Sequence, residues 1–251
     1  MQRAVAAAIA ETAPGEGPVP ARFLLDIGAS EGTFCKVISA LTSGRVETRA
    51  LDPNPAMEQR FHENMGVCGA YFHRAAFGGP ERAGGTGWID GEVVPYFEFH
   101  HPYDVVCEIM TFQFLFPERA RHIQWIAENL TSEGCFITCE KFLSYVDEAF
   151  INNEVAKEKF KSQYFGTQQL LDKKSAVLAK KGGMNITMAY AEDMERILSR
   201  AFRCVVQFWD AGNFKGYIAA HSDIPVRRFL NSLIPLNSLY STVRTPRIVQ
   251  R

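Results

Sequence analysis

The residues with the clearest chemical potential form one short motif with two acids and two glycines. It reads Asp26-Ile27-Gly28-Ala29-Ser30-Glu31-Gly32 and follows an apolar run that begins at Phe23. Glycines at a strand-to-helix turn let the backbone approach a ligand where a Cβ would clash. The spacing is D-x-G-x-x-x-G, unlike the G-x-G-x-x-G pattern that seats a diphosphate on a helix N-terminus. Because Glu31 would repel a diphosphate, we expect a ligand with a cationic amino-acid end.

A further acid, Asp52, follows the second predicted strand, at residues 46–51. In Rossmann-type sites a carboxylate at the equivalent place accepts hydrogen bonds from the hydroxyls of a ribose. The simpler alternative is that Asp52 caps the helix that begins near Pro55. The glycine motif before it favours the ribose interpretation.

The elements that must position these acids alternate between strands and helices, which is typical of a parallel, doubly wound α/β sheet. We predict strands at 23–27, 46–51, 69–77, 103–109 and 134–139, and helices at 32–42, 118–130 and 191–201. Residues 78–91 are rich in glycine and predict a loop or hairpin excursion. Two late strand patterns, 203–209 and 214–220, are joined by a tight reversal and predict an antiparallel last strand.

The chain divides into five segments on composition and pattern. These are an N-terminal helix and linker (1–22), a cofactor-binding Rossmann-like core (23–143), a helical insertion or lid (144–185), the closing helix and β-hairpin of the core (186–223) and a basic C-terminal tail (224–251). The insertion is rich in lysine, and either covers the strand ends as a substrate lid or is a solvated helical pair. The tail has no acidic residue, which suits either a solvated segment or one that meets an acidic partner.

Bulk properties exclude several classes of function. The formal net charge of -1 gives no general attraction to nucleic acid or anionic membrane. No apolar run approaches the roughly 18 residues of a membrane span. The six cysteines contain no CxxC pair, and the adjacent His100 and His101 would point apart on an extended chain. We therefore expect a cytoplasmic protein without a metal site or a disulfide framework.

Over residues 23–220 the sequence resembles the class I S-adenosylmethionine-dependent methyltransferases. Leu25–Gly32 is similar to their glycine motif, and Leu51–Met57 is similar to their ribose-binding motif. The resemblance implies a Rossmann-like, seven-stranded sheet, mostly parallel with an antiparallel last strand, and S-adenosyl-L-methionine as cofactor. The cofactor contacts that it implies are Asp26, Gly28, Ala29, Ser30, Gly32, Asp52, Pro53, Ala75 and Glu108.

Within this superfamily, three stretches resemble the carboxy-S-adenosylmethionine synthases of tRNA wobble-uridine modification, which make a carboxylated cofactor from S-adenosylmethionine and prephenate. They are Thr111-Phe112-Gln113-Phe114-Leu115, Gly134–Cys139 and Glu140-Lys141-Phe142. The helical insertion and the stretch Trp209–Phe214 resemble the same family. This closer resemblance implies carboxy-S-adenosyl-L-methionine as an alternative cofactor, and Gln113 and Arg196 as substrate-binding residues. A weaker resemblance, to the FkbM-type methyltransferases, covers only the first third of the chain.

The leading functional hypothesis is methyl transfer from S-adenosylmethionine to a small molecule or a modified nucleoside. Such a transfer is an in-line displacement that depends mainly on positioning, and a general base helps some acceptors. The candidates at the strand ends are Glu108, Lys141 and Tyr145, with Glu140 and His73 beside them. We favour Glu108 as the base, against the alternative of a salt-bridged or solvated carboxylate.

Three other functions stay open on the sequence. A relative of the carboxy-S-adenosylmethionine synthases is the first, and a non-catalytic S-adenosylmethionine-binding partner protein is the second. The third is a serine hydrolase, because Gly28–Gly32 also matches G-x-S-x-G, although that fold normally places several strands before the motif. Nucleic acid has weak support as a partner from the basic tail, and a homodimer is compatible with the sequence.

Overall fold

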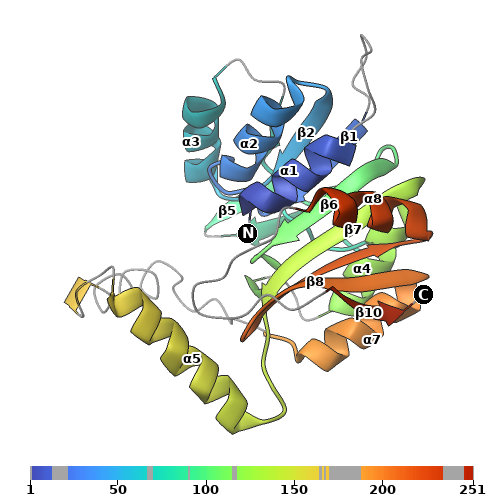
Figure 1. Ribbon diagram of the computed structural model, residues 1–251. Helices are drawn as coiled ribbons and strands as arrows, with labels where there is room; N and C mark the ends of the chain where they lie inside the picture. The colour runs from blue at the N-terminus through green and yellow to red at the C-terminus, as the bar shows by residue number, and fades with distance from the viewer. Residues whose placement is uncertain are drawn as a thin grey trace.

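One large mixed sheet organises the protein, with helices against both of its faces (Figure 1). The structure is a computed structural model that describes residues 2–12, 22–66, 70–89, 91–114, 118–163, 166, 168–169, 188–233 and 246–250. Within those residues, every helix is too short or too polar to cross a membrane. The predicted α/β class is confirmed.

The large sheet has eight strands in the order β10-β8-β9-β7-β6-β1-β2-β3, and β4 and β5 form a separate hairpin. The strands are β1 (Arg22–Ile27), β2 (Val46–Leu51), β3 (Ala70–His73), β4 (Thr86–Ile89), β5 (Glu92–Pro95), β6 (Tyr103–Ile109), β7 (Leu130–Lys141), β8 (Cys204–Ala211), β9 (Phe214–Ala220) and β10 (Arg247–Gln250). From β1 the chain runs outward through β2 and β3 and then returns to β6 on the other side of β1. The carboxyl ends of β1 and β6 thus form the switch point where ligands bind in open α/β sheets.

The central strands are apolar because both of their faces are covered. Leu24 packs into the core on one side of the sheet and Leu25 into the core on the other, and both are fully buried. This alternation follows from the two-residue repeat of a strand. It explains why the central strands appear as near-continuous hydrophobic runs in the sequence.

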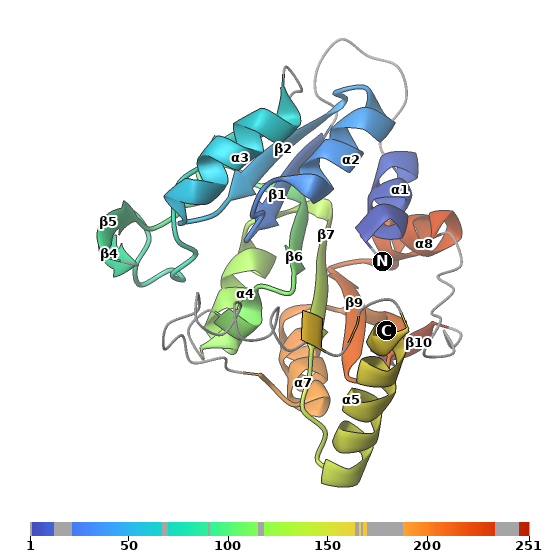
Figure 2. The same cartoon turned by 90° about the vertical axis from the view of Figure 1, so that its left-hand side faces the viewer.

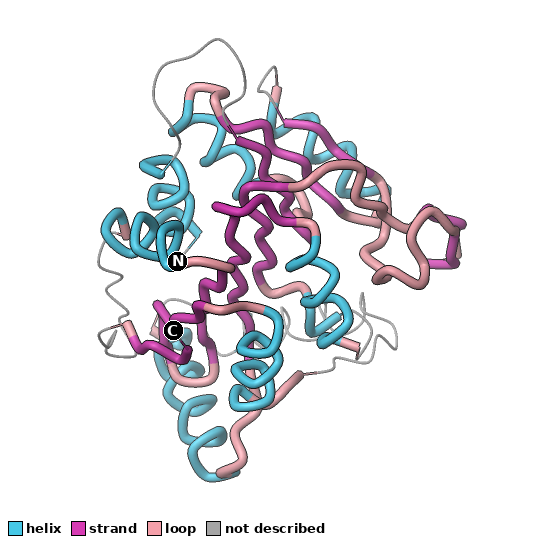
Figure 3. The backbone as a smooth tube through the Cα atoms, turned by 90° about the vertical axis from the view of Figure 1, so that its right-hand side faces the viewer, coloured by secondary structure: helices cyan, strands magenta, loops and turns pink. Residues whose placement is uncertain are grey.

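The helices divide between the two faces of the sheet (Figures 2 and 3). Helices α1, α2, α3 and α8 lie on one face, and α4 and α7 pack on the other. Their bounds are α1 (Gln2–Thr12), α2 (Thr33–Thr42), α3 (Pro55–Met65), α4 (Arg119–Glu128), α7 (Ala191–Ala201) and α8 (Asp223–Ser232), and a short 3-10 helix, η1, spans Phe112–Phe114.

The predicted closing hairpin is confirmed, since β9 runs antiparallel to both β7 and β8. The predicted number of strands is one too few. The eighth strand, β10, lies in the predicted basic tail and pairs antiparallel with the edge strand β8. A strand of four residues carries too little pattern to be recognised without its partner.

Two smaller boundaries also differ from the prediction. The third strand ends at His73 rather than near residue 77, because Ala76 leaves the main sheet and bridges to Tyr96. Strand β7 starts at Leu130, four residues before the predicted Gly134. The predicted excursion at 78–91 includes β4 and part of the hairpin that it forms with β5.

The predicted insertion contributes helix α5 (Asp147–Ser162), which projects from the end of β7 beside the β8–β9 hairpin (Figures 1 and 2). None of its residues is buried. Most of the insertion after Ser162 lies outside the described residues, so the prediction of a lid there is neither supported nor contradicted. Five cysteines, at positions 35, 107, 135, 139 and 204, are buried free thiols.

Candidate functional site

The glycine loop joins β1 to α2 at the switch point of the sheet. The amides of Gly28 and Ala29 both donate to the Leu51 carbonyl at the end of β2, at 2.7 and 3.1 Å. Gly28 and Gly32 have φ angles of 74° and 78°, in the left-handed region that favours glycine. The loop is therefore hydrogen-bonded to the end of β2, the strand that Asp52 directly follows.

Protein packing also requires glycine at these two positions. A Cβ on Gly28 would overlap the Thr111 side chain, and a Cβ on Gly32 would overlap the ring of Phe61. The sequence interpretation explained both glycines by the approach of a ligand. The structure supplies a different reason for the missing side chains, so the glycines alone do not indicate what binds.

Asp52 connects the loop to the start of α3. Its carboxylate accepts hydrogen bonds from the amide of Ser30, at 3.0 Å, and from the amide of Asn54, at 2.9 Å. Asn54 in turn caps α3 by accepting from the Ala56 amide. Burial raises the pKa of Asp52, and the two amide hydrogen bonds oppose that shift. Asp52 does not itself cap the helix, and each of its oxygens retains an acceptor site for a ligand hydroxyl.

Asp26 lies beneath the loop rather than on it. Its carboxyl group is buried and accepts a hydrogen bond from the Cys35 thiol at 3.3 Å. Burial raises its pKa to about 7, with the Cys35 hydrogen bond opposing the shift and the charges of Glu108 and Asp52 adding to it. Asp26 is therefore bonded to α2 through Cys35, and its contact with a cofactor stays a prediction.

Glu108, the favoured candidate for the base, makes its hydrogen bonds within the protein. It is fully buried at the end of β6, where Oε1 accepts from the amides of Thr111 and Phe112 at 2.5 and 2.8 Å. Its other oxygen accepts from the Thr138 hydroxyl at 2.6 Å. Glu108 therefore holds the chain after β6, and its role as a base stays a prediction.

The predicted residues Lys141 and Gln113 also make internal contacts. Lys141 Nζ lies 2.9 Å from the Glu154 carboxylate on α5 and 5.2 Å from the centre of the Phe150 ring. Burial lowers the pKa of Lys141, and the hydrogen bond to Glu154 opposes that shift. Gln113 donates to the Met110 carbonyl at 3.1 Å. The sequence carries no signal for Glu154, because it is one of many charged residues in a helical pattern.

The structure brings together Tyr145 and Arg196, which the sequence places far apart. The Tyr145 hydroxyl donates to Asp193 at 3.1 Å, and Arg196 forms an ion pair with the same carboxylate. The Tyr145 ring also stacks on Tyr190, with centroids 4.1 Å apart. This exposed cluster lies after β7 and at the start of α7. Of the other predicted cofactor contacts, Ala75 is buried and Pro53 is partly exposed at the end of β2.

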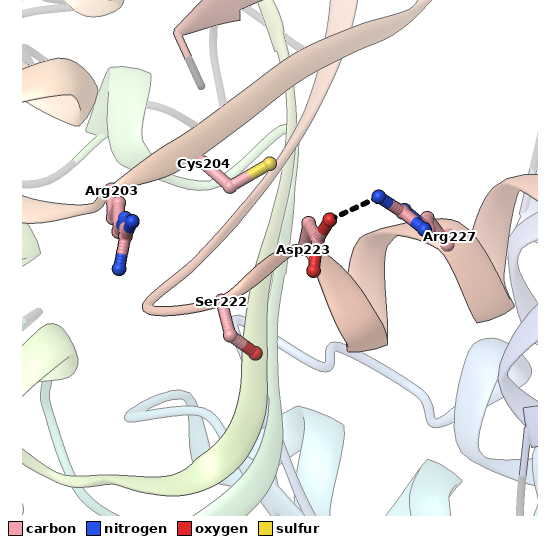
Figure 4. A pocket seen from close by; sticks show the side chains of 5 residues that line it. All are labelled: Arg203, Cys204, Ser222, Asp223 and Arg227. Atoms are coloured by element: carbon pink, nitrogen blue, oxygen red, sulfur yellow. Dashed lines mark ion pairs between the residues drawn. The ribbon is translucent and has the colours of Figure 1, made fainter.

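A cavity of about 430 Å³ lies away from these residues, where β8 and α8 begin (Figure 4). Cys204, the first residue of β8, lines it together with Arg203, Ser222, Asp223 and Arg227. Asp223 and Arg227 form an ion pair across 2.5 Å. No residue of this cavity belongs to the predicted site. In the described part of the chain, no cluster of three or more His, Cys, Asp or Glu side chains is arranged to bind a metal ion.

Comparison with known proteins gives structural likeness without sequence likeness. No protein-family model and no curated protein matches the chain. The plantazolicin methyltransferase BpumL in complex with SAH is similar at a TM-score of 0.55 and 10% identity, over 88% of this chain and 83% of that chain. A complex between the Haloferax volcanii Trm112 methyltransferase activator and a methyltransferase is similar at a TM-score of 0.52 and 11% identity, over 88% of this chain and 90% of that chain.

Human N-acetylserotonin methyltransferase in complex with SAM is similar at a TM-score of 0.51 and 13% identity. The match covers 87% of this chain and 51% of that chain. The fold is that of the class I methyltransferases. At these identities the likeness establishes the fold alone. The α/β-hydrolase alternative gains no support from this fold, and the Ser30 hydroxyl donates to the Met57 sulfur at 3.3 Å.

Proposed function

We propose that the protein is a methyltransferase that binds S-adenosyl-L-methionine at the carboxyl ends of β1, β2 and β6. The observation that carries the proposal is the position of Asp52, whose carboxylate holds the glycine loop through Ser30 and the start of α3 through Asn54. A ribose bonded to this carboxylate would lie between the two segments. The structural neighbours crystallised with SAM or SAH support the choice of cofactor.

The residues present fit such a cofactor at its ribose end. Asp52 is partly exposed and has acceptor capacity beyond its two amide contacts. The bound cofactor would supply an electrophilic methyl group for displacement by an acceptor nucleophile. The protein's contribution would be to orient the two reactants and exclude water, which accounts for much of the acceleration in such reactions. We propose a small molecule or a modified nucleoside as acceptor.

No described contact favours the carboxylated cofactor over S-adenosylmethionine. Arg196, the residue expected to hold an extra carboxylate, is ion-paired with Asp193 on the exposed side of α7. We therefore place simple methyl transfer first. A carboxy-S-adenosylmethionine synthase activity and a non-catalytic cofactor-binding role are the alternatives that the experiment below separates.

The first test is native mass spectrometry of the purified protein, followed by titration calorimetry with S-adenosylhomocysteine. We expect bound S-adenosylmethionine or its homocysteine product, and a heavier ligand would favour the synthase alternative. Asp52→Ala should weaken S-adenosylhomocysteine binding at least about tenfold, since it removes hydrogen bonds to a charged acceptor. Tight cofactor binding without turnover in a broad acceptor screen would favour the non-catalytic alternative.

The matched control is Glu63→Ala, which removes an exposed carboxylate from the neighbouring helix α3. It should bind like the wild type. Circular dichroism melts of both variants show whether a loss of binding reflects unfolding. An absence of binding to the wild-type protein at millimolar ligand would refute the proposed function, while equal binding by Asp52→Ala would refute the assignment of the ribose site.

A further inference from the structure

Two buried carboxyl groups meet at a single backbone amide below the candidate site. The Phe112 amide donates to Oε1 of Glu108, at 2.8 Å, and to Oε1 of Glu140, at 2.9 Å. Glu108 ends the buried part of β6, and Glu140 lies near the end of the neighbouring parallel strand β7. Both side chains are at most 1% exposed. One carboxyl oxygen of Glu108 and one of Glu140 therefore accept a hydrogen bond from the same amide, that of Phe112.

Two carboxyl groups this close in a buried site cannot both be ionised at low cost. Burial raises the pKa of Glu140 well above its ordinary value, and the neighbouring Glu108 adds to the shift. Glu108 accepts from three protein donors, an arrangement that suits a carboxylate. Glu140 is thus the member of the pair that retains a proton.

The other charged groups around the pair are few in the described residues. Arg119 on α4 is buried, donates to the Phe112 carbonyl at 3.2 Å, and favours ionisation of Glu140. Asp26 on β1 lies near Glu108. Lys215 is the register partner of Glu140 on β9, but its ammonium group bonds to Asp210. Among the described residues Arg119 is the guanidinium near the pair, and its one positive charge balances only one of the two carboxylates.

The pair anchors the segment that carries Thr111. Met110 has a φ of 63°, unusual for a residue with a side chain, and its amide bonds to Cys139 on β7 at 2.8 Å. The next two amides both donate to Glu108. The Thr111 side chain occupies the space that a Cβ on Gly28 would take. A chain of direct contacts thus runs from the two carboxyl groups through residues 110–112 to the glycine loop.

We propose that Glu108 and Glu140 are positioning residues, which share one proton and hold residues 110–113 so that Thr111 forms one wall of the glycine loop. The shared proton and the anchoring of the segment do not depend on the proposed function. The consequence for cofactor binding does rest on that function. The experiments below therefore measure the two parts separately.

The shared proton has a definite consequence for stability against pH. Because the pKa of Glu140 is raised in the folded protein, its native state holds a proton that the unfolded chain releases above about pH 4.5. Stability should fall as the pH rises from there towards the folded pKa. Glu140→Gln mimics the neutral acid and should remove this contribution. Asp26 also makes stability fall with rising pH, up to its pKa of about 7, but this contribution is the same in the wild type and in Glu140→Gln.

The first experiment compares wild type with Glu140→Gln by infrared difference spectroscopy at neutral pH, and by urea unfolding across the pH range. We expect the band of a protonated carboxylic acid in the wild type and its loss in the variant, together with a shallower fall of stability with pH. A difference spectrum that shows a lost carboxylate, or equal pH slopes, would overturn the shared proton.

The second experiment follows amide hydrogen exchange in a peptide that covers residues 110–114. Glu108→Gln offers one acceptor oxygen to three donors, so exchange there should rise at least about tenfold. Glu140→Gln should change the exchange little, because the side-chain oxygen of the new glutamine still accepts from the Phe112 amide. The control Glu133→Gln removes an exposed carboxylate from the same strand β7. Equal exchange in Glu108→Gln and the control would overturn the anchoring role.

If Glu108→Gln does not fold, Thr138→Val supplies the second variant, since it removes only the hydroxyl donor to Glu108. It should raise exchange in the same peptide, and unchanged exchange would count against the anchoring role.

S-adenosylhomocysteine affinity is the remaining measurement. It should fall about tenfold in Glu108→Gln and stay within about threefold of the wild type in Glu140→Gln. Equal affinity in both variants would overturn the link to the glycine loop. A wild-type protein that binds no S-adenosylhomocysteine would refute the proposed function. In that case the first two experiments would still test the shared proton and the anchoring of the segment.

Discussion

At the scale of single residues, the buried acids around the loop bond within the protein, and Asp52 is the acid that is also partly exposed to a ligand. Asp26 and Glu108 are buried and accept hydrogen bonds from protein donors. Asp52 is partly exposed at the strand end. Burial thus separates three acids that appear equivalent in the sequence, because each lies at or near the end of a predicted strand.

Gly28→Ala tests the contact between the glycine loop and Thr111. The substitution combines an unfavourable φ, which costs about 1–2 kcal/mol, with overlap of the new methyl group and the Thr111 side chain. We expect a loss of unfolding free energy larger than the conformational part alone, measured by urea denaturation.

Gly44→Ala is the matched control, since Gly44 has a φ of 77° and no atom lies within 4 Å of the position that an added Cβ would take. It should lose only the conformational part. Adding Thr111→Ala to Gly28→Ala should recover part of the difference, because it removes Oγ1 and Cγ2 of Thr111 but leaves its Cβ 2.7 Å from the new methyl group. Equal losses in the two glycine variants would show that the Thr111 contact contributes nothing.

At the scale of elements, α5 is attached to the sheet by polar contacts instead of a hydrophobic core. Glu154 accepts from Lys141 on β7 and from Asn213 in the β8–β9 turn, at 2.9 Å in each case. Asn213 also donates to the Phe150 carbonyl at 3.0 Å. An element held in this way opens at a low free-energy cost compared with the core.

Glu154→Gln should therefore loosen α5 without unfolding the sheet. We expect amide exchange in residues 147–162 to rise about tenfold while the melting temperature changes little. Glu148→Gln, in the exposed first turn of the same helix, should leave the exchange unchanged. A large fall in melting temperature would show instead that α5 is part of the cooperative core.

Acid should loosen α5 in the same way. Burial opposes ionisation of Glu154, but hydrogen bonds from Lys157, Asn213 and Lys141 outweigh it and lower the pKa to about 2. The contribution of Glu154 is therefore complete above its ordinary value of 4.5 and is lost as the pH falls towards 2. Exchange in α5 should rise over that interval in the wild type and change less in Glu154→Gln.

At the scale of the whole molecule, the eighth strand extends the methyltransferase sheet at its far edge. Arg247 of β10 donates twice to the Gln207 side-chain oxygen on β8, at 3.0 and 2.9 Å, and forms an ion pair with Glu195 on α7. Strand β10 thereby covers the backbone edge of β8, which would otherwise be open for pairing.

Truncation after residue 245 should leave the other seven strands folded and lower the melting temperature by a few degrees, because it removes one short edge strand. Arg247→Ala should reproduce most of that shift, and Ile248→Ala, with an exposed side chain on the same strand, should not. Circular dichroism melts measure all three. Loss of the folded signal on truncation would show that β10 is required for the sheet to form.

The sequence by itself determined the order of elements, the glycine loop and the acid at the end of β2. These depend on local signals, namely strand-length apolar runs, glycine at a left-handed turn and an acid where a buried strand ends. Only the tertiary structure decided which acids are exposed, why Gly28 and Gly32 lack side chains, and where β10 pairs. The physical reason is that each of these depends on residues distant in sequence: Glu108 on Thr138, Gly28 on Thr111, and Arg247 on Gln207.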